Sequence, residues 1–172
     1  NTIIFDKTGT LTKGKPEVTD IIVFDGMGES DALKMAASLE KGSEHSLAES
    51  IVKYAENKKL QLSKADKFQA IPGHGVEGVI EGKKVILGNR KLMKRENISI
   101  ENQEANISHL EQEGKTVIML VSNGKLIALI AVADTIKESA VEGLKQLQKL
   151  GIEAAMITGD NQRTANAIAQ KL

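Results

Sequence analysis

The sequence contains no cysteine, no tryptophan and only two prolines among its 172 residues. Without cysteine, the chain can form neither disulfides nor thiolate metal sites, which fits a reducing compartment. Aromatic residues make up 2% of the chain while hydrophobic residues reach 41%, so aliphatic side chains must fill the core. Lysine plus arginine equals aspartate plus glutamate at 23 each, so no net charge attracts the chain to nucleic acid or an anionic membrane.

Long apolar runs are also absent. A membrane-spanning helix needs ~20 apolar residues, whereas the longest run here, 126–133, has the length of a strand. We find no signal peptide. The chain begins at Asn1 rather than at methionine, and we interpret it as a piece of a longer protein. We expect a soluble, monomeric, cytoplasmic segment that does not bind nucleic acid.

The two ends of the chain differ in pattern from its middle. Short unbroken apolar runs predict buried strands at 2–5 and 152–157, and apolar residues at helical spacing predict helices at 136–150 and 161–172. The middle is instead typical of hairpins flanked by helices, with a tight turn at Asn123-Gly124. We expect further strands at 18–24, 67–71, 76–81, 83–87, 116–121 and 125–132, and further helices at 31–39, 47–57, 91–95 and 101–113.

This organisation predicts an α/β domain with a parallel sheet, made from both ends of the chain, and an inserted α+β domain. We assign 1–24 and 133–172 to the discontinuous domain. The insert, at 25–132, is expected to have an antiparallel sheet flanked by helices. Thr135, with Glu138 three residues later, is predicted to form a capping box at the start of the next helix.

Two aspartates follow the predicted buried strands at the ends of the chain: Asp6 in DKTGTLT and Asp160 in TGD. Ligands of parallel sheets bind beyond the carboxyl ends of the strands. A carboxylate there can be a nucleophile or a metal ligand, and the positive N-terminus of the helix after Asp160 favours an anion. One such aspartate alone is more often a turn cap, but the two strings together are far more specific.

The string Asp6-Lys7-Thr8-Gly9-Thr10 resembles the phosphorylation signature of P-type ATPases, pumps of the haloacid-dehalogenase-like superfamily. The resemblance implies a haloacid-dehalogenase-like Rossmannoid domain, incomplete at its C-terminal end, in which Asp6 attacks the γ-phosphate of ATP. It also implies Mg²⁺ bound by the Asp6 carboxylate and the Thr8 carbonyl. Phosphoryl transfer depends mainly on positioning and charge neutralisation, which these residue types suit.

The second string, Thr158-Gly159-Asp160, resembles the next motif of the same family. The resemblance implies that Thr158 hydrogen-bonds the transferred phosphoryl group, and that Gly159 and Asp160 belong to the catalytic site together with Lys7. A glycine at this position lets the backbone approach a phosphate closely.

Glu40 and His45 resemble the residues that hold adenine in heavy-metal-transporting P-type ATPases, near a Ser-Glu-His-Pro motif. A carboxylate can accept the adenine amino hydrogen and an imidazole can contact the ring. A lone histidine before a helix is more often a surface or capping residue. Ser46 stands where the family has proline, and with Glu49 it could form a capping box instead.

Two glycine-containing turns complete the resemblance. Gly73 and Gly75 match the family's G-x-G-V turn, and Gly88 and Asn89 match its later Gly-Asn pair. The resemblance implies that these four residues line the adenine pocket, although glycines before a hairpin are usually only turn residues. No GK[ST] follows, so this is not a Walker loop. The combination resembles the copper(I)-exporting subgroup more than the zinc and cadmium subgroup.

The resemblance thus implies the cytoplasmic ATP-binding and phosphorylation region of an integral membrane pump for heavy-metal ions, with Cu(I) as the transported ion. The ion would bind in membrane helices that this sequence does not contain. Residues 134–137 resemble the family hinge. The family continues with a G-D-G-x-N-D segment that completes its Mg²⁺ site, and this sequence lacks it, so we expect weak or no turnover by this chain alone.

Two other functions remain open at this point. The first is a stand-alone phosphatase of the same superfamily with a large cap. Thr8 counts against it, because a D-x-D signature would place a second aspartate, the general acid, at that position. The second is a non-catalytic module that binds nucleotide.

Overall fold

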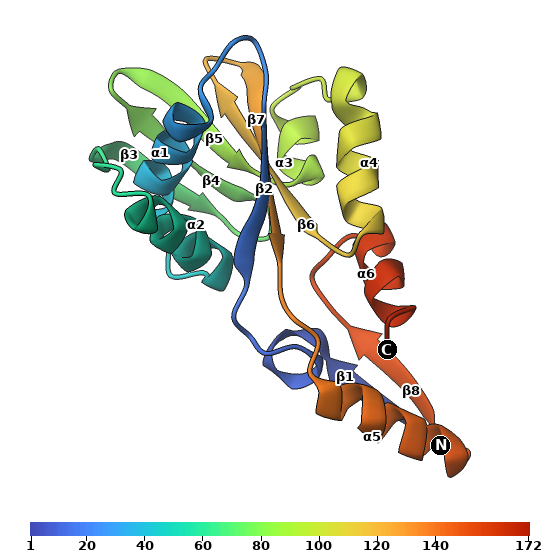
Figure 1. Ribbon diagram of the computed structural model, residues 1–172. Helices are drawn as coiled ribbons and strands as arrows, with labels where there is room; N and C mark the ends of the chain where they lie inside the picture. The colour runs from blue at the N-terminus through green and yellow to red at the C-terminus, as the bar shows by residue number, and fades with distance from the viewer.

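The computed structural model describes residues 1–172 and contains two separate sheets (Figure 1). The larger sheet has six antiparallel strands in the order β2-β7-β6-β5-β4-β3, and the smaller is a parallel pair, β1-β8. The small sheet extends below the large one, and both chain ends lie on its side of the molecule (Figure 1).

The strands are β1 (Thr2–Asp6), β2 (Glu17–Val23), β3 (Ala65–Ile71), β4 (Gly75–Ile80), β5 (Lys83–Gly88), β6 (Thr116–Ser122), β7 (Lys125–Ala133) and β8 (Glu153–Ile157). The helices are α1 (Glu29–Glu40), α2 (Ser46–Asn57), α3 (Arg90–Arg95), α4 (Glu104–Gln112), α5 (Glu138–Lys149) and α6 (Gln162–Ala169), with short helical turns η1 (Lys7–Leu11) and η2 (Glu101–Gln103). None of the helices has both the length and the apolar character that crossing a bilayer requires.

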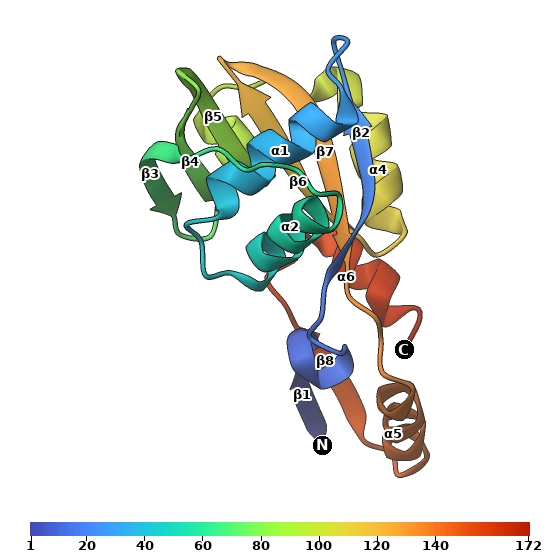
Figure 2. The same ribbon diagram turned by 60° about the vertical axis from the view of Figure 1, so that its left-hand side comes forward.

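The six-stranded sheet is buried on both faces. Helices α1 and α2 cover one face, and α3 and α4 cover the other (Figure 2). Alternate side chains of β6 belong to the two sides: Ile118 and Leu120 pack in the α1–α2 cluster, whereas Val117, Met119 and Val121 pack in the α3–α4 cluster. This follows from the two-residue period of a strand. A doubly covered sheet explains how a chain with so few aromatics obtains a core.

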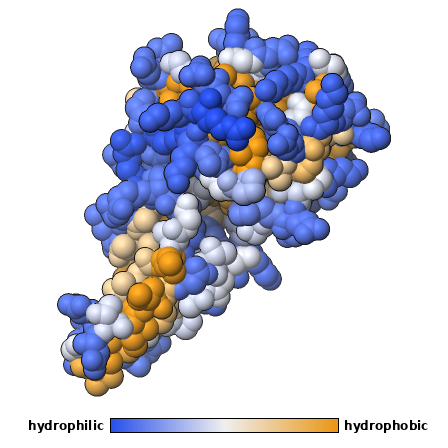
Figure 3. Space-filling view, turned by 180° about the vertical axis from the view of Figure 1, so that it is seen from behind, coloured by the Kyte–Doolittle hydropathy of each residue, from blue (hydrophilic) through white to orange (hydrophobic).

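The small sheet is covered far less. We call β1, η1, α5 and β8 the arm. Both its strands form as predicted, but Ile4 and Ile157 are 68% and 61% exposed, and apolar side chains gather on its surface (Figure 3). The prediction that these two strands are buried is therefore wrong. Only one helix, α5, packs on this two-stranded sheet, against β8. One helix does not cover both faces of a sheet, so the strands stay exposed.

Two chain segments join the arm to the six-stranded sheet, and the Asp134 carboxylate ties them together. It accepts hydrogen bonds from the Thr12 hydroxyl (2.6 Å), the Gly14 amide (3.0 Å) and the Lys15 amide (3.2 Å). Thr12 is almost fully buried. One side chain thus satisfies three donors on the opposite segment, which makes the junction a defined structure.

The pairing of β2 differs from the predicted division of the chain. We assigned residues 1–24 to the discontinuous domain, but β2 pairs with β7 and so lies in the six-stranded sheet. The cause is a long-range contact, because the outer edge of β7 hydrogen-bonds to the strand that begins at Glu17. The division into two domains stays a prediction, and the sheet pairing favours a first boundary between residues 12 and 17 rather than after 24.

The predicted capping box at the start of α5 is wrong. The N-cap of α5 is Lys137, with no side-chain hydrogen bond to the helix. Thr135 is instead drawn into the junction, where its carbonyl accepts a hydrogen bond from the Lys13 amide at 2.8 Å, and Ile136 pairs with Thr12. Thr135 therefore pairs through its backbone with the opposite segment of the junction and does not cap α5.

Candidate functional site

Asp6 and Thr158 lie at the same edge of the small sheet. Strands β1 and β8 are parallel, and Asp6 stands opposite Ile157, the residue before Thr158. Asp6 is exposed, and its carboxylate does not cap the turn that follows it. The turn-cap alternative therefore does not hold here, and Asp6 remains available to react with a ligand.

Asp160 has the opposite environment. Its buried carboxylate forms an ion pair with the Lys7 ammonium and accepts hydrogen bonds from the Thr158 hydroxyl (3.0 Å) and the Thr116 hydroxyl (2.8 Å). Burial alone would raise the pKa of Asp160, but the Lys7 ammonium and the two hydroxyls outweigh it and hold that pKa below its ordinary value. Asp160 is thus ionised and fully engaged, while Asp6 is free.

The turn between Asp6 and Leu11 has an irregular shape. Thr8 has extended backbone angles, and Gly9 follows with φ +77°, a left-handed conformation that favours glycine. The Lys137 ammonium binds the Gly9 carbonyl at 2.6 Å. This turn therefore contacts the residue that begins α5.

The edge offers one free carboxylate to a cation, that of Asp6. A free carboxylate at Asp6 is the hard oxygen ligand that Mg²⁺ prefers. Nowhere in the structure do three or more histidine, aspartate or glutamate side chains lie close enough together to bind one metal ion. Asp160 is already paired with Lys7. The free Asp6 carboxylate is therefore compatible with Mg²⁺, and the Thr8 carbonyl stays a predicted ligand.

Glu40, at the end of α1, is a buried acid without a full set of partners. Its side chain is 8% exposed, and Oε2 has no hydrogen-bond partner. Burial raises its pKa to about 7, against a smaller lowering by the Ser43 hydroxyl. An unsatisfied buried carboxyl oxygen is energetically costly. It borders a cavity of ≈220 Å³, which fits a ligand that presents an N–H group, as adenine does.

His45 is the N-cap of α2. Its Nδ1 accepts a hydrogen bond from the Leu47 amide at 3.2 Å, so the alternative capping box of Ser46 and Glu49 is not the one that forms. The ring is exposed. Because Nδ1 is an acceptor, the neutral ring carries its proton on Nε2, which leaves an N–H donor for a ligand.

The two glycine turns meet at one corner of the large sheet. Gly75 stands opposite Gly88 in the β4–β5 pair, and a Cβ on Gly75 would lie 2.1 Å from the Leu87 carbonyl oxygen. Asn89 donates to the Gly73 carbonyl at 2.9 Å and caps α3 by accepting from the Lys91 amide at 3.0 Å. The four predicted residues thus form one compact corner, in which only glycine fits at position 75.

Sequence reasoning missed Thr116, the partner of Asp160 from the large sheet. No motif contains it, and 44 positions separate the two residues. The signal that could have found it is the threonine at the start of a run that is otherwise wholly apolar, 116–121. Its hydroxyl connects the six-stranded sheet directly to the loop after β8.

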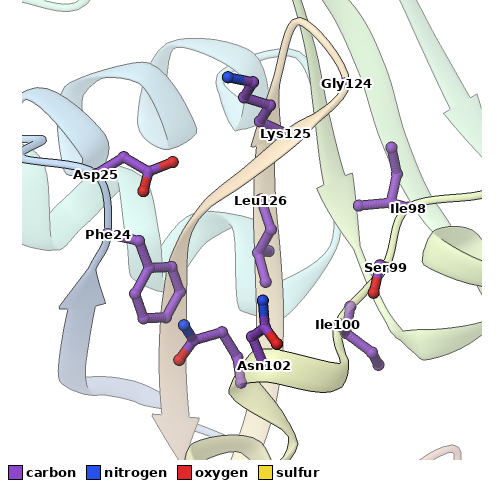
Figure 4. A pocket seen from close by; sticks show the side chains of 10 residues that line it. Phe24, Asp25, Ile98, Ser99, Ile100, Asn102, Gly124, Lys125 and Leu126 are labelled. Carbon is purple, nitrogen blue, oxygen red and sulfur yellow. The ribbon is translucent and has the colours of Figure 1, made fainter.

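A larger cavity, of ≈370 Å³, contains none of the predicted residues. It lies where the β6–β7 turn meets the segment after α3 and the end of β2 (Figure 4). Apolar side chains and a few polar ones line it: Phe24, Asp25, Ile98, Ser99, Ile100, Asn102, Gln103, Gly124, Lys125 and Leu126. We do not include it in the candidate site.

Comparison with known proteins covers the whole chain. A family described as haloacid dehalogenase-like hydrolase matches residues 1–172. The copper-exporting P-type ATPase of Staphylococcus aureus strain JH9 is 46% identical over 173 residues, and that of Staphylococcus saprophyticus is 45% identical over 172 residues. Each match covers 100% of this chain and 21% of the relative. The chain therefore spans about a fifth of the length of these relatives.

Solved structures agree with the fold. A zinc-transporting PIB-type ATPase in the E2.Pi state superposes with a TM-score of 0.73 at 37% identity, covering 98% of this chain and 27% of that one. The catalytic domain of the CPx-ATPase CopB-B gives 0.69 at 29% identity, covering 100% and 58%. The N-domain of HMA6, a copper-transporting P-type ATPase, gives 0.58 at 26% identity, covering 69% and 99%. The predicted fold class is confirmed.

Proposed function

The chain belongs to the haloacid dehalogenase-like hydrolase family, and from that membership we propose that it is the ATP-binding and phosphorylation region of a copper(I)-exporting P-type ATPase. Its homology to copper-exporting P-type ATPases extends along its entire length, as the DKTGT and TGD strings predicted. The proposal places the segment on the cytoplasmic side of the membrane, with ATP as its substrate and Cu(I) bound elsewhere in the pump.

The free carboxylate of Asp6 is the observation that supports this proposal most. In the proposed reaction a carboxylate oxygen of Asp6 forms a bond to the γ-phosphorus of ATP, the bond to the bridging oxygen breaks, and ADP leaves. Thr158, at the same edge, would donate a hydrogen bond to the transferred phosphoryl group once its hydroxyl turns away from Asp160. Asp160 keeps the Lys7 ammonium at this edge, where positive charge favours the phosphate.

Mg²⁺ bound by the Asp6 carboxylate and the Thr8 carbonyl would neutralise phosphate charge. For the nucleotide, we propose that Glu40 accepts a hydrogen bond from the adenine amino group and that His45 contacts the ring. Gly73, Gly75, Gly88 and Asn89 would form the opposite wall, because their compact corner presents backbone rather than side chains.

The relatives differ in the ion that they move. The sequence relatives are copper exporters at 46% and 45% identity, whereas a structural neighbour at 37% identity transports zinc. The fold of a cytoplasmic region does not select an ion that binds elsewhere. We propose Cu(I) on the higher sequence identity, and ion-dependent phosphorylation with Cu(I) and Zn²⁺ compared side by side decides between them.

Phosphorylation of the intact pump tests the proposal. Membranes that contain the pump are incubated with γ-labelled ATP and quenched in acid, and the label on the protein is counted. We expect Asp6→Asn to abolish the acid-stable label, because an amide cannot form the acyl phosphate. Asp25→Asn, at an exposed aspartate in a remote loop, is the control. Retained label in Asp6→Asn would refute the assignment of the phosphoryl acceptor.

Calorimetry on the 172-residue chain tests the nucleotide pocket. We expect His45→Asn to weaken ATP binding by about tenfold, equivalent to about 1.4 kcal/mol, because the ring is lost. Asparagine is also a good N-cap, so this variant keeps the start of α2 and separates ring contact from helix capping. Unchanged affinity would remove His45 from the site.

A further inference from the structure

Helix α6, which follows the loop of residues 158–161, packs against α4 of the six-stranded domain. The Thr164 hydroxyl donates to the Lys115 carbonyl at 2.9 Å, and the Lys171 ammonium donates to the Glu113 carbonyl at 2.6 Å. Both acceptors lie just beyond the C-terminal end of α4. The helix after Asp160 is therefore attached to the large sheet side of the molecule and not to the arm.

Glu111, on α4, is the centre of this contact. Its side chain is 2% exposed. Oε1 accepts hydrogen bonds from Arg90 Nε (2.9 Å) and Asn161 Nδ2 (2.9 Å), and Oε2 accepts from Arg90 Nη2 (3.0 Å) and Arg163 Nη1 (3.2 Å). These donors come from α3, from α6 and from the residue that caps α6. A buried carboxylate with four donors from two other elements holds them at fixed places.

The charges around Glu111 balance. Arg90 also binds Glu104 through both terminal nitrogens, and Arg163 binds the same carboxylate at 3.1 Å. The Arg90 guanidinium lowers the pKa of Glu104 to about 2. Two guanidinium groups therefore face two carboxylates. Removal of Glu111 would leave two cations facing one partly exposed carboxylate, and Arg90 would lose its buried partner.

On one side, the cluster ends at Asn161, the last residue of the loop 158–161. Asn161 follows Asp160 directly, and Asp160 binds both Lys7 and Thr116. Asn161 also caps α6 with its Oδ1, through hydrogen bonds to the amides of Arg163 (2.9 Å) and Thr164 (3.1 Å). The amide group of Asn161 thus has one end on α6 and the other on Glu111.

On the other side, the cluster ends one residue from the glycine corner. Arg90 follows Asn89 directly, and Asn89 holds the Gly73 carbonyl. An uninterrupted series of hydrogen bonds and single peptide steps therefore runs from the proposed nucleotide wall to the proposed phosphoryl acceptor.

We propose that Glu111 is a positioning residue, which holds the loop of residues 158–161 against the six-stranded domain and so sets its place relative to the Gly73–Asn89 corner. This rests on the proposed function, because only a reaction between nucleotide and Asp6 requires the two sites in register. Glu111 itself touches neither site. It acts through Asn161 on one side and through Arg90 on the other.

A distance measurement tests this role. Because the chain has no cysteine, spin labels attach only to cysteines that are introduced. Spin labels on cysteines introduced at the exposed positions Lys83 and Lys145 report the separation of the large sheet and the arm. We expect a single narrow distance distribution in the otherwise unmutated chain and a broad one in Glu111→Ala. Glu101→Ala, at an exposed glutamate just before α4, is the control and is expected to keep the narrow distribution.

A second variant keeps the test decisive if Glu111→Ala does not fold. Asn161→Asp retains the capping oxygen, since aspartate is an equally good N-cap, but it replaces the donor to Glu111 with a repelling oxygen. We expect the distance distribution to broaden while the melting temperature changes little. Adding Glu111→Gln returns an N–H donor to the pair and is expected to restore the narrow distribution, which a purely structural defect at α6 would not show.

A narrow distribution in Asn161→Asp, or in a folded Glu111→Ala, would overturn the positioning role. The result is separate from the proposed function, because the measurement needs no nucleotide. Calorimetry on the unmutated chain addresses that function: absence of ATP binding would contradict the proposed pocket, whatever the distances show.

Discussion

The six-stranded domain and the arm both contain strands of aliphatic residues, but these strands are buried in the domain and exposed in the arm. In the large domain, helices on both faces bury alternate sides of each central strand, and Leu120 is fully buried. In the arm, strands of the same character lie open, with Ile4 68% exposed. Strand formation therefore needs only local sequence and one partner, whereas burial depends on how many layers surround the strand.

The two regions also differ in where their charges lie. The arm exposes the carboxylate at the end of its first strand, Asp6, to solvent. The large domain instead buries Glu40 with an unsatisfied oxygen and Glu111 with every oxygen satisfied. A buried carboxyl that lacks partners suggests a missing ligand, whereas a saturated one suggests a structural connection.

Core truncation is expected to show the largest difference between the regions. We expect Leu120→Ala to lower the free energy of unfolding by about 3–4 kcal/mol, because it leaves a cavity between packed layers. The matched change in the arm, Ile4→Ala, is expected to cost less than about 1 kcal/mol, because that side chain already contacts water. Urea denaturation measures both, and equal losses would mean that the arm is covered in solution.

Replacing Glu40, the buried acid at the end of α1, should raise the free energy of unfolding rather than lower it. The pKa of Glu40 is raised from an ordinary 4.5 to about 7 in the folded chain, so its contribution to stability is present below pH 4.5 and is lost as the pH rises through 7. We expect Glu40→Gln to be more stable than the unmutated chain at pH 8, by about 3 kcal/mol at most, and to differ little near pH 4.

Thermal unfolding at the two pH values measures this effect, with Glu44→Gln, an exposed neighbour, as the control. The same variant is expected to bind ATP more weakly if Glu40 accepts the adenine amino hydrogen. A Glu40→Gln chain with the pH dependence of the unmutated chain would show that Glu40 is not buried in solution.

The junction between the two regions should give the smallest effect. We expect Asp134→Asn to cost about 1–2 kcal/mol, because an amide replaces one acceptor of a charge-assisted cluster. Local opening is a more sensitive readout than global stability. Trypsin should cleave after Lys13 faster in this variant than in Asp25→Asn, where the positive φ of 54° is one that asparagine also tolerates. Equal cleavage rates would contradict a locking role for Asp134.

The local sequence pattern predicted helices and strands well where their formation depends only on a segment adjacent in the sequence. The hairpin at Asn123-Gly124 forms between β6 and β7, and the strands predicted at 76–81 and 83–87 pair with each other as β4 and β5. The helix expected at 101–113 forms in two pieces, η2 and α4. The capping box at Thr135 failed because the junction offered its backbone a partner far away in the sequence.

The sequence by itself determined which chemistry the chain can carry. Asp6 and Thr158 could be placed at one edge in advance, because parallel strands end together. Gly75 was singled out by its resemblance to a family turn, and the structure adds a close backbone approach there that leaves no room for a Cβ.

Tertiary structure alone decided which carboxylates are free and which are committed. Asp160 is engaged by Lys7 and Thr116, and Glu111 joins α3 to α6, across separations of 153, 44, 21 and 50 positions. Such contacts leave no periodic trace in the sequence, since each depends on where two distant elements meet. The exposure of β1 has the same origin, because burial is a property of the surrounding layers and not of the strand.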